Sequence, residues 1–126
     1  MYRLVIEDSI SSAHFIDGYQ GKCSEVHGHN WKVIITVKGK WLDKLNILVD
    51  YGILKKLLKD LLESLDHKFL NKELNEPHIT SEFLAKYIYQ KYKKLLAVSI
   101  KQVGSVTLDK VGIGETDKVL CEYWED

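Results

Sequence analysis

Cysteine, proline and net charge are all scarce in this sequence of 126 residues. The two cysteines, Cys23 and Cys121, lie far apart, so they do not form the dense disulfide framework of a small secreted domain. We therefore expect a protein of the reducing cytoplasm. Eighteen basic and eighteen acidic residues leave a formal net charge of zero at pH 7. Because no basic stripe is interleaved with aromatic residues, nucleic-acid binding has little support, and a small molecule is the expected partner.

Long apolar runs are missing as well. No stretch is long and uninterrupted enough to span a bilayer, and no signal peptide opens the chain, so we expect no membrane association. Hydrophobic residues nevertheless make up 45% of the sequence. This content is enough for a core without disulfide bonds, and we expect residues 1–126 to form a single domain.

The spacing of apolar residues predicts strands at both ends of the chain and two helices between them. Asp50 could cap the first helix, and Thr80 or Ser81 could open the second. The predicted elements lie at residues 2–7, 27–38, 53–65, 80–95, 99–111 and 118–124. Their order, β-β-α-α-β-β, favours the α+β class: a four-stranded antiparallel sheet with both helices on one face.

Three of the five histidines fall within or near one short segment, Cys23-Ser24-Glu25-Val26-His27-Gly28-His29. In a strand His27 and His29 project to the same side, and His14 ends a first apolar segment that can pair beside the second. Three neutral imidazoles could hold zinc at about 2.0–2.1 Å and leave a fourth position for substrate or water. A closed structural site with Cys23 as the fourth ligand is the alternative, and the spacing does not separate the two.

Two further polar clusters lie outside the histidine segment. Asp66 and His67 follow the first predicted helix, where the carboxylate could orient the imidazole for proton transfer. A helix cap or a histidine placed favourably in the helix dipole is the alternative. Glu115 lies between Gly114 and Thr116 and could accept paired hydrogen bonds from a flat amino-heterocycle. An ordinary polar turn would have the same composition.

Taken together and in order, these motifs resemble the 6-pyruvoyl-tetrahydropterin synthase and 6-carboxytetrahydropterin synthase family over practically the whole chain. The resemblance rests on Ser12-Ala13-His14-Phe15, Cys23-xxx-His27-Gly28-His29, Leu48-Val49-Asp50-Tyr51-Gly52, Leu65-Asp66-His67, Thr80-Ser81-Glu82 and Gly114-Glu115-Thr116. It implies the tunnelling fold (T-fold), whose subunits assemble through their sheets into trimeric barrels that stack as hexamers. Active sites then lie at subunit interfaces.

The resemblance also implies a role for each motif. His14, His27 and His29 bind zinc; Cys23, Asp66 and His67 transfer protons; Glu115 anchors a pterin ring, with Thr80 and Ser81 as further substrate contacts. The implied substrate is 7,8-dihydroneopterin triphosphate. The chain departs from many relatives at the second helix, because two residues separate Pro77 from Thr80 where relatives often have the proline and threonine adjacent.

The product is less firmly implied than the substrate. The short spacing, with three residues between Cys23 and His27, resembles that of the bacterial and archaeal 6-carboxytetrahydropterin synthases. These enzymes release triphosphate and acetaldehyde and supply 7-deazaguanine (queuosine or archaeosine) synthesis. A 6-pyruvoyl product is an alternative. Glu25 resembles a subgroup that cleaves the side chain to 6-hydroxymethyl-dihydropterin, although it could equally be a solvent-facing loop residue.

A non-catalytic zinc-stabilised module that captures a pterin or purine through Glu115 is the remaining alternative. Cys23, Asp66 and His67 argue against it, because simple binding needs no matched base and acid.

Overall fold

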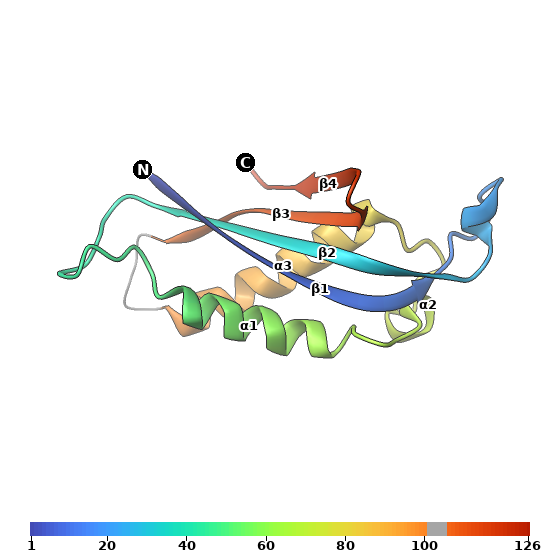
Figure 1. Cartoon of the computed structure of the whole chain (residues 1–126), viewed down its shortest axis with the longest axis horizontal. Coiled ribbons are helices and arrows are strands. Elements are labelled where there is room, and N and C mark those ends of the chain that lie inside the picture. Colours follow the sequence, from blue (N-terminus) through green and yellow to red (C-terminus); the bar gives the residue numbers. More distant parts are fainter. Residues whose placement is uncertain (101–105) are drawn as a thin grey trace.

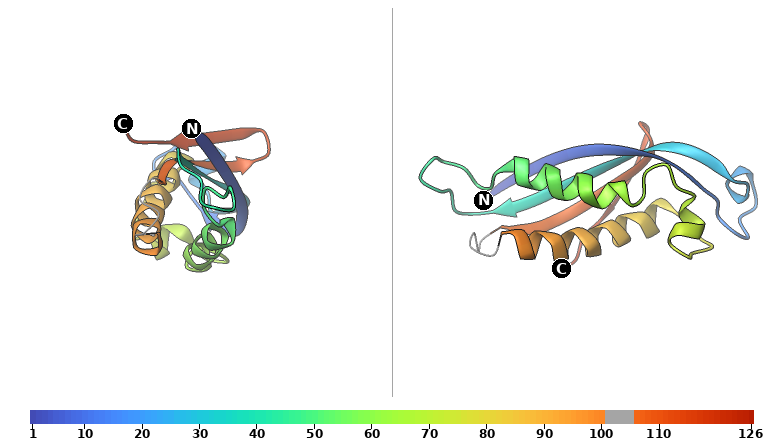
Figure 2. Two further views of the ribbon diagram at one scale, coloured as in Figure 1. Left: turned by 90° about the vertical axis from the view of Figure 1, so that its left-hand side faces the viewer. Right: turned by 90° about the horizontal axis from the view of Figure 1, so that it is seen from below.

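The computed structural model describes residues 1–100 and 106–126, which form an antiparallel sheet covered on one face by helices (Figure 1). The four strands follow the order β1-β2-β3-β4 across the sheet. An end-on view shows the two long helices side by side beneath the strands (Figure 2). The elements are β1 (Tyr2–His14), η1 (Lys22–Ser24), β2 (His27–Gly39), α1 (Tyr51–Glu63), α2 (Leu70–Glu73), α3 (Ser81–Ser99), β3 (Thr107–Thr116) and β4 (Val119–Tyr123). The predicted α+β class and four-stranded antiparallel sheet are confirmed.

Strands β1 and β2 form a long antiparallel ladder that pairs Tyr2 with Gly39 at one end and His14 with His27 at the other. Successive side chains alternate between the two faces of the ladder. On the face toward the helices, β1 buries residues at even positions and β2 buries residues at odd positions. These are Ile6, Ile10, Ser12 and His14 on β1, and Trp31, Val33, Ile35 and Val37 on β2. The same alternation places His27 and His29 on this inner face.

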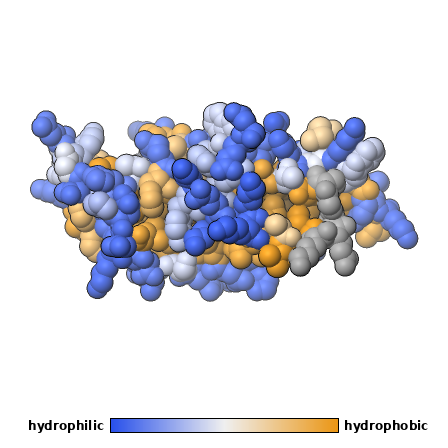
Figure 3. Space-filling view, turned by 180° about the vertical axis from the view of Figure 1, so that it is seen from behind, coloured by the Kyte–Doolittle hydropathy of each residue, from blue (hydrophilic) through white to orange (hydrophobic). Residues whose placement is uncertain are grey.

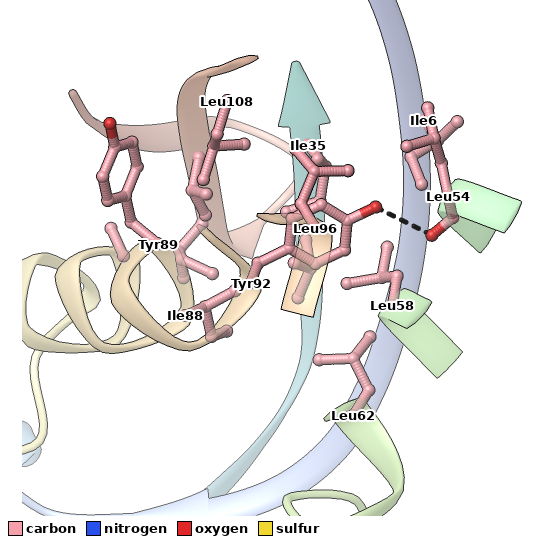
Figure 4. Close-up of a cluster of buried hydrophobic side chains, with 14 of the residues drawn as sticks. Ile6, Ile35, Leu54, Leu58, Leu62, Ile88, Tyr89, Tyr92, Leu96 and Leu108 are labelled. Atoms are coloured by element: carbon pink, nitrogen blue, oxygen red, sulfur yellow. Dashed lines mark hydrogen bonds between the residues drawn. The ribbon is translucent and has the colours of Figure 1, made fainter. Parts of the chain in front are cut away.

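The two long helices begin at the predicted caps. Asp50 accepts a hydrogen bond from the backbone N–H of Gly52 at 2.8 Å, and Thr80 accepts one from Phe83 at 3.0 Å. Helix α1 buries Leu54, Leu58 and Leu62, which recur every four residues and face α3 and the sheet. The Tyr92 hydroxyl of α3 donates a hydrogen bond to the Leu54 carbonyl at 2.9 Å, which joins the two helices within the core (Figure 4).

The predicted strand at 99–111 is wrong at its start. Helix α3 continues to Ser99, β3 begins at Thr107, and residues 101–105 lie outside the described part of the chain. Leu96 and Ile100 are both buried and lie four residues apart, so they extend the apolar face of the helix. The β-branched residues near the end of this helix have a high strand propensity, but packing against the sheet favours the helix.

The polar-turn alternative for Glu115 is also wrong, because Gly112 to Thr116 belong to β3. A side chain at Gly114 would place its Cβ 2.9 Å from the Val119 carbonyl and 3.1 Å from the Thr116 carbonyl. Glycine therefore allows the tight return from β3 to β4 directly beside Glu115.

Strands β1 and β4 are the two edges of the sheet, and both expose apolar side chains. Tyr2 and Val5 on β1 and Val119 and Leu120 on β4 are each at least 47% exposed. Apolar areas also lie between hydrophilic side chains on the face shown in Figure 3. Across residues 1–100 and 106–126, no helix combines the length and apolarity needed to cross a membrane.

Candidate metal centre and its surroundings

The three predicted zinc ligands come together on the inner face, where the β1–β2 ladder ends. His14 lies directly opposite His27, and His29 pairs with Ser12 two residues further along. The ring centroids lie 4.4 Å apart for His14 and His27, 5.0 Å for His14 and His29, and 4.7 Å for His27 and His29. One ligand nitrogen from each ring lies within 4.8 Å of the other two. Strand alternation and ladder register thus assemble a compact cluster of three imidazoles.

Two of the rings are oriented by backbone carbonyls. His14 Nδ1 lies 2.7 Å from the Ile79 carbonyl, and His27 Nδ1 lies 2.6 Å from the Glu25 carbonyl. A carbonyl only accepts, so each Nδ1 must carry the proton, and in the neutral ring the lone pair is then on Nε2. This arrangement is typical of histidines that bind a metal through Nε2.

The unused nitrogens support a cation in this cluster. Nε2 of His14 and Nε2 of His29 are buried, and neither has a hydrogen-bond partner within the described residues. Buried polar atoms nearly always have a partner, so two such nitrogens beside each other indicate a missing ligand. Desolvation is the main cause that lowers the pKa of both His14 and His29, and neighbouring imidazoles lower these pKa values further. Low pKa values favour the neutral rings that bind metals.

Cys23 lies outside this cluster. It sits half-buried in the short turn η1, and its backbone carbonyl accepts a hydrogen bond from Ile16 N–H at 2.7 Å. In the described part of the chain, the group of ligand atoms within 4.8 Å of one another contains the three histidines without the Cys23 thiol. The geometry therefore favours an open three-histidine centre over a closed site with a cysteine ligand. Glu25 is exposed immediately before His27.

Asp66 and His67 lie in the turn after α1, docked on the free edge of β1. Asp66 Oδ1 accepts a hydrogen bond from Ser11 N–H at 2.8 Å, and its Oδ2 lies 3.1 Å from His67 Nδ1. The His67 backbone N–H donates to the Ser11 carbonyl at 2.7 Å. The hydrogen bond from Ser11 is the largest cause that lowers the pKa of Asp66, and His67 adds to it. A carboxylate held in this way can orient the imidazole; a role in proton transfer stays a prediction.

The His67 side chain is 81% exposed, and its backbone has a φ of 55°, which side-chain-bearing residues rarely adopt. Such backbone strain is concentrated at functional sites. An open depression of about 540 Å³ lies beside this ring and is lined by both His67 and His29, with Lys68 and Phe69 from the same turn. Among the described residues, Asp66 and His67 make hydrogen bonds to each other, to Ser11 and, through the Asp66 backbone N–H, to the Leu62 carbonyl, but none to Cys23.

Glu115 projects from β3 to the inner face, between the metal cluster and the start of α3. Ser81 Oγ donates a hydrogen bond to Glu115 Oε1 at 3.3 Å, and Glu115 Oε2 lies 3.7 Å from His29 Nε2. Thr80 differs from Ser81, because its hydroxyl oxygen caps α3 through Phe83. The structure thus brings Ser81 and Glu115 together and leaves Thr80 with a capping role.

Sequence reasoning did not identify the Ile79 carbonyl or Ser11. Both act through the backbone, which every residue shares, so no residue type could have marked them.

Comparison with known proteins gives a consistent relationship over the whole fold. The sequence profile described as 6-pyruvoyl tetrahydropterin synthase matches residues 3–126. The chain is 26% identical to the 6-carboxy-5,6,7,8-tetrahydropterin synthase of Haemophilus influenzae, over 99% of this chain and 100% of that protein. It is 35% identical to the enzyme of the same name from Bacillus subtilis, over 90% of this chain and 79% of that protein.

A solved structure shows the same architecture. The 6-pyruvoyl tetrahydropterin synthase of Caenorhabditis elegans has a TM-score of 0.80 and 28% identity, over 100% of this chain and 98% of that chain. The agreement in sequence and fold extends from the first strand to the last. The chain therefore belongs to the 6-pyruvoyl tetrahydropterin synthase family.

Proposed function

We propose that this protein converts 7,8-dihydroneopterin triphosphate to 6-carboxy-5,6,7,8-tetrahydropterin, with release of triphosphate and acetaldehyde. The observation that carries the proposal is the pair of buried Nε2 atoms of His14 and His29, which have no hydrogen-bond partner in the described part of the chain and lie next to the Glu115 carboxylate. Relatives from Haemophilus influenzae and Bacillus subtilis carry the name of this reaction. The product would supply 7-deazaguanine synthesis in the reducing cytoplasm, where the Cys23 thiol stays free.

Zinc is the ion that suits this donor set. Three imidazole nitrogens are a common protein ligand set for catalytic zinc, which keeps a fourth position open. His14, His27 and His29 would hold the ion, and the carbonyls of Ile79 and Glu25 would keep two of the rings in the ligating tautomer. Bound there, zinc would supply Lewis-acid stabilisation of negative charge on the side-chain oxygens of the substrate.

Glu115 and Ser81 would position the pterin. A carboxylate accepts two parallel hydrogen bonds from an amino-heterocycle, and the Ser81 hydroxyl already holds Glu115 from α3. Because Glu115 also lies 3.7 Å from His29 Nε2, a ring bound to it would bring its side chain to the metal cluster. Thr80 could still contact the substrate through its hydroxyl hydrogen, since its hydroxyl oxygen caps the helix as an acceptor and leaves the O–H able to donate.

Proton transfer would use Cys23 with the Asp66–His67 pair. Cys23, as a thiolate, would remove a carbon-bound proton from the substrate side chain, and His67 would exchange a proton with a side-chain hydroxyl. Asp66 would keep the His67 ring oriented and stabilise its protonated form. A pure binding module has no need of these three groups, which favours catalysis over capture alone.

An oligomer would complete this set, since one chain does not join Cys23 to His67 among its described residues. The edge strands β1 and β4 carry exposed apolar side chains and could continue the sheet into neighbouring copies. We place the active sites at these subunit interfaces, in a hexamer built from two trimeric barrels.

The reaction is tested by incubating zinc-loaded protein with dihydroneopterin triphosphate and identifying the products. Acetaldehyde and the 6-carboxy product support the proposal, and a 6-pyruvoyl product or no turnover contradicts it. Appearance of 6-hydroxymethyl-dihydropterin would assign the chemistry to Glu25, which stands two residues from Cys23.

Two variants test the role of Cys23. Cys23→Ala should abolish the carboxy product without changing zinc content, whereas Glu25→Gln should leave formation of the carboxy product intact. Loss of zinc from Cys23→Ala would instead support the alternative of a closed structural site in which Cys23 is the fourth ligand.

A further inference from the structure

Trp31 closes the metal cluster on the side of the hydrophobic core. It follows His29 by two residues on β2, so its side chain lies on the same inner face. The indole is fully buried, with 0% exposure. Its ring lies 4.7 Å from the His14 ring at an interplanar angle of 74° and 5.2 Å from the His29 ring at 77°. A single indole thus contacts two of the three imidazoles edge-on.

The indole is itself fixed in place. Trp31 Nε1 donates a hydrogen bond to the Ser12 carbonyl at 3.2 Å. Ser12 pairs with His29 across the ladder and precedes His14 by two residues. Trp31 also belongs to the apolar core, which includes Val33, the next inward-facing residue of β2 and also fully buried. The indole therefore connects a rigid core to the ladder segment that carries the ligands.

His29 depends on this packing more than the other two ligands do. His14 and His27 each have a carbonyl on Nδ1, but no ring nitrogen of His29 makes a hydrogen bond within residues 1–100 and 106–126. Its nearest polar neighbour, Glu115, is 3.7 Å away, beyond a normal hydrogen bond. Besides the His27 and His14 rings, at 4.7 and 5.0 Å, the Trp31 edge at 5.2 Å is the aromatic contact that orients this ring from the core side.

We propose that Trp31 is a positioning residue of the metal centre, which holds the His29 and His14 rings in the ligating orientation and closes the centre on the core side. This role rests on the proposed zinc site. It extends the metal centre beyond its three ligands, to a residue that neither binds the ion nor reacts. Loss of such an outer partner typically weakens metal binding about 10–100-fold.

Metal affinity and ligand geometry are measured with Co²⁺, a coloured substitute for zinc, on wild type, Trp31→Phe and Trp31→Leu. Trp31→Leu should bind Co²⁺ about 10–100-fold more weakly, with an altered visible absorption spectrum. Trp31→Phe keeps an aromatic edge but loses the Nε1–H bond and part of the ring, so its Co²⁺ affinity should lie between those of wild type and Trp31→Leu. Trp41→Leu is the matched control, because that side chain is 66% exposed. Unfolding of each metal-free protein is measured in parallel to separate folding from binding.

Fluorescence gives a second measurement, which tests whether Trp31 lies beside the bound metal. Bound Co²⁺ quenches a nearby indole, so wild type and Trp41→Leu should lose Trp31 emission on metal addition. The remaining indoles of Trp31→Phe, which are at least 59% exposed, should keep theirs. If the Trp31 variants are less stable but bind Co²⁺ with wild-type affinity and spectrum, the positioning role is overturned. If wild type binds no Co²⁺, the zinc centre itself is wrong.

Discussion

The imidazole cluster and the Asp66–His67 pair differ in how complete each is within one chain. The cluster is the more enclosed: His14 is fully buried, and within the described residues neither its Nε2 nor that of His29 has a hydrogen-bond partner. The pair is open: its hydrogen bonds hold it to the edge of β1, but the His67 ring is 81% exposed.

This difference separates two kinds of functional site. Burial of a polar atom without a partner is costly, and a cation held by the three imidazoles would remove that cost. The hydroxyl of the fully buried Tyr92 provides the contrast, because it donates a hydrogen bond to the Leu54 carbonyl and so has its burial cost offset within the fold. An exposed, oriented histidine has no such cost, because water can satisfy the ring nitrogen that Asp66 does not contact.

Removing a ligand from the enclosed cluster should have the largest effect. His14→Ala leaves two imidazoles, so we expect zinc affinity to fall by more than about 100-fold, beyond the usual cost of losing an outer-shell partner. Turnover should be lost with the metal. Metal analysis and chelator competition measure the change, with His78→Ala as the control, because that side chain is 57% exposed. Wild-type zinc binding by His14→Ala would show that the cluster is not the metal centre.

Replacing a proposed proton-transfer group should lower turnover without changing the zinc content. We expect Cys23→Ala and His67→Ala each to lower turnover by about 10²–10⁴-fold, the usual contribution of a general acid or base, with zinc content unchanged.

If the set is completed between subunits, mixing the two inactive variants under conditions of subunit exchange should restore measurable turnover. A mixture that stays inactive despite verified exchange would place Cys23 and His67 in the same subunit's site and remove the contrast between the two regions.

Glu115 lies beside the imidazole cluster, 3.7 Å from His29 Nε2, and its replacement should show whether it serves the substrate or the metal. Glu115→Gln removes a charged acceptor, so we expect a rise in KM of about 10–150-fold and little change in zinc affinity. Glu122→Gln is the matched control, since Glu122 pairs with Lys110 at 2.8 Å on the opposite face of the sheet. A fall in zinc affinity with an unchanged KM would instead make Glu115 part of the metal centre.

The smallest effect should come from the pH dependence of the Asp66 contact. The pKa of Asp66 is lower in the folded chain than its ordinary value of 3.8, so the unfolded chain takes up the proton first as the pH falls. The stabilisation is complete well above pH 3.8 and is lost as the pH falls from there through the lower folded value.

Asp66→Asn should therefore show less acid destabilisation than wild type. The loss of unfolding free energy between about pH 6 and about pH 3 is measured for both proteins by urea unfolding without metal. Asp60→Asn should behave like wild type, because Asp60 pairs only with Lys56 on the exposed surface of α1. Equal acid sensitivity of Asp66→Asn and wild type would show that the Ser11 contact contributes nothing to stability.

Much of the site could be predicted because it depends on strand geometry. Two histidines two residues apart must share a face, and a neighbouring strand that ends in His14 can supply the third. The helix caps Asp50 and Thr80 were predictable for a similar reason, since their side chains act on the backbone within three residues.

Other features required the assembled fold. The end of α3 at Ser99 was mispredicted because burial of Ile100 against the sheet outweighs its strand propensity. The meeting of Ser81 with Glu115 joins residues far apart in the chain, as does the contact of the Ile79 carbonyl with His14.

By itself, the sequence determined the class of fold, the ladder that carries the three histidines and the chemistry available to them. These follow from local periodicity and from the bonding preferences of each side chain. Only the tertiary structure decided that Cys23 stands apart from the cluster, that Trp31 contacts two of its rings and that two Nε2 atoms have no hydrogen-bond partner among residues 1–100 and 106–126. The physical reason is that burial and long-range packing depend on which elements meet, and no local pattern of residues records that.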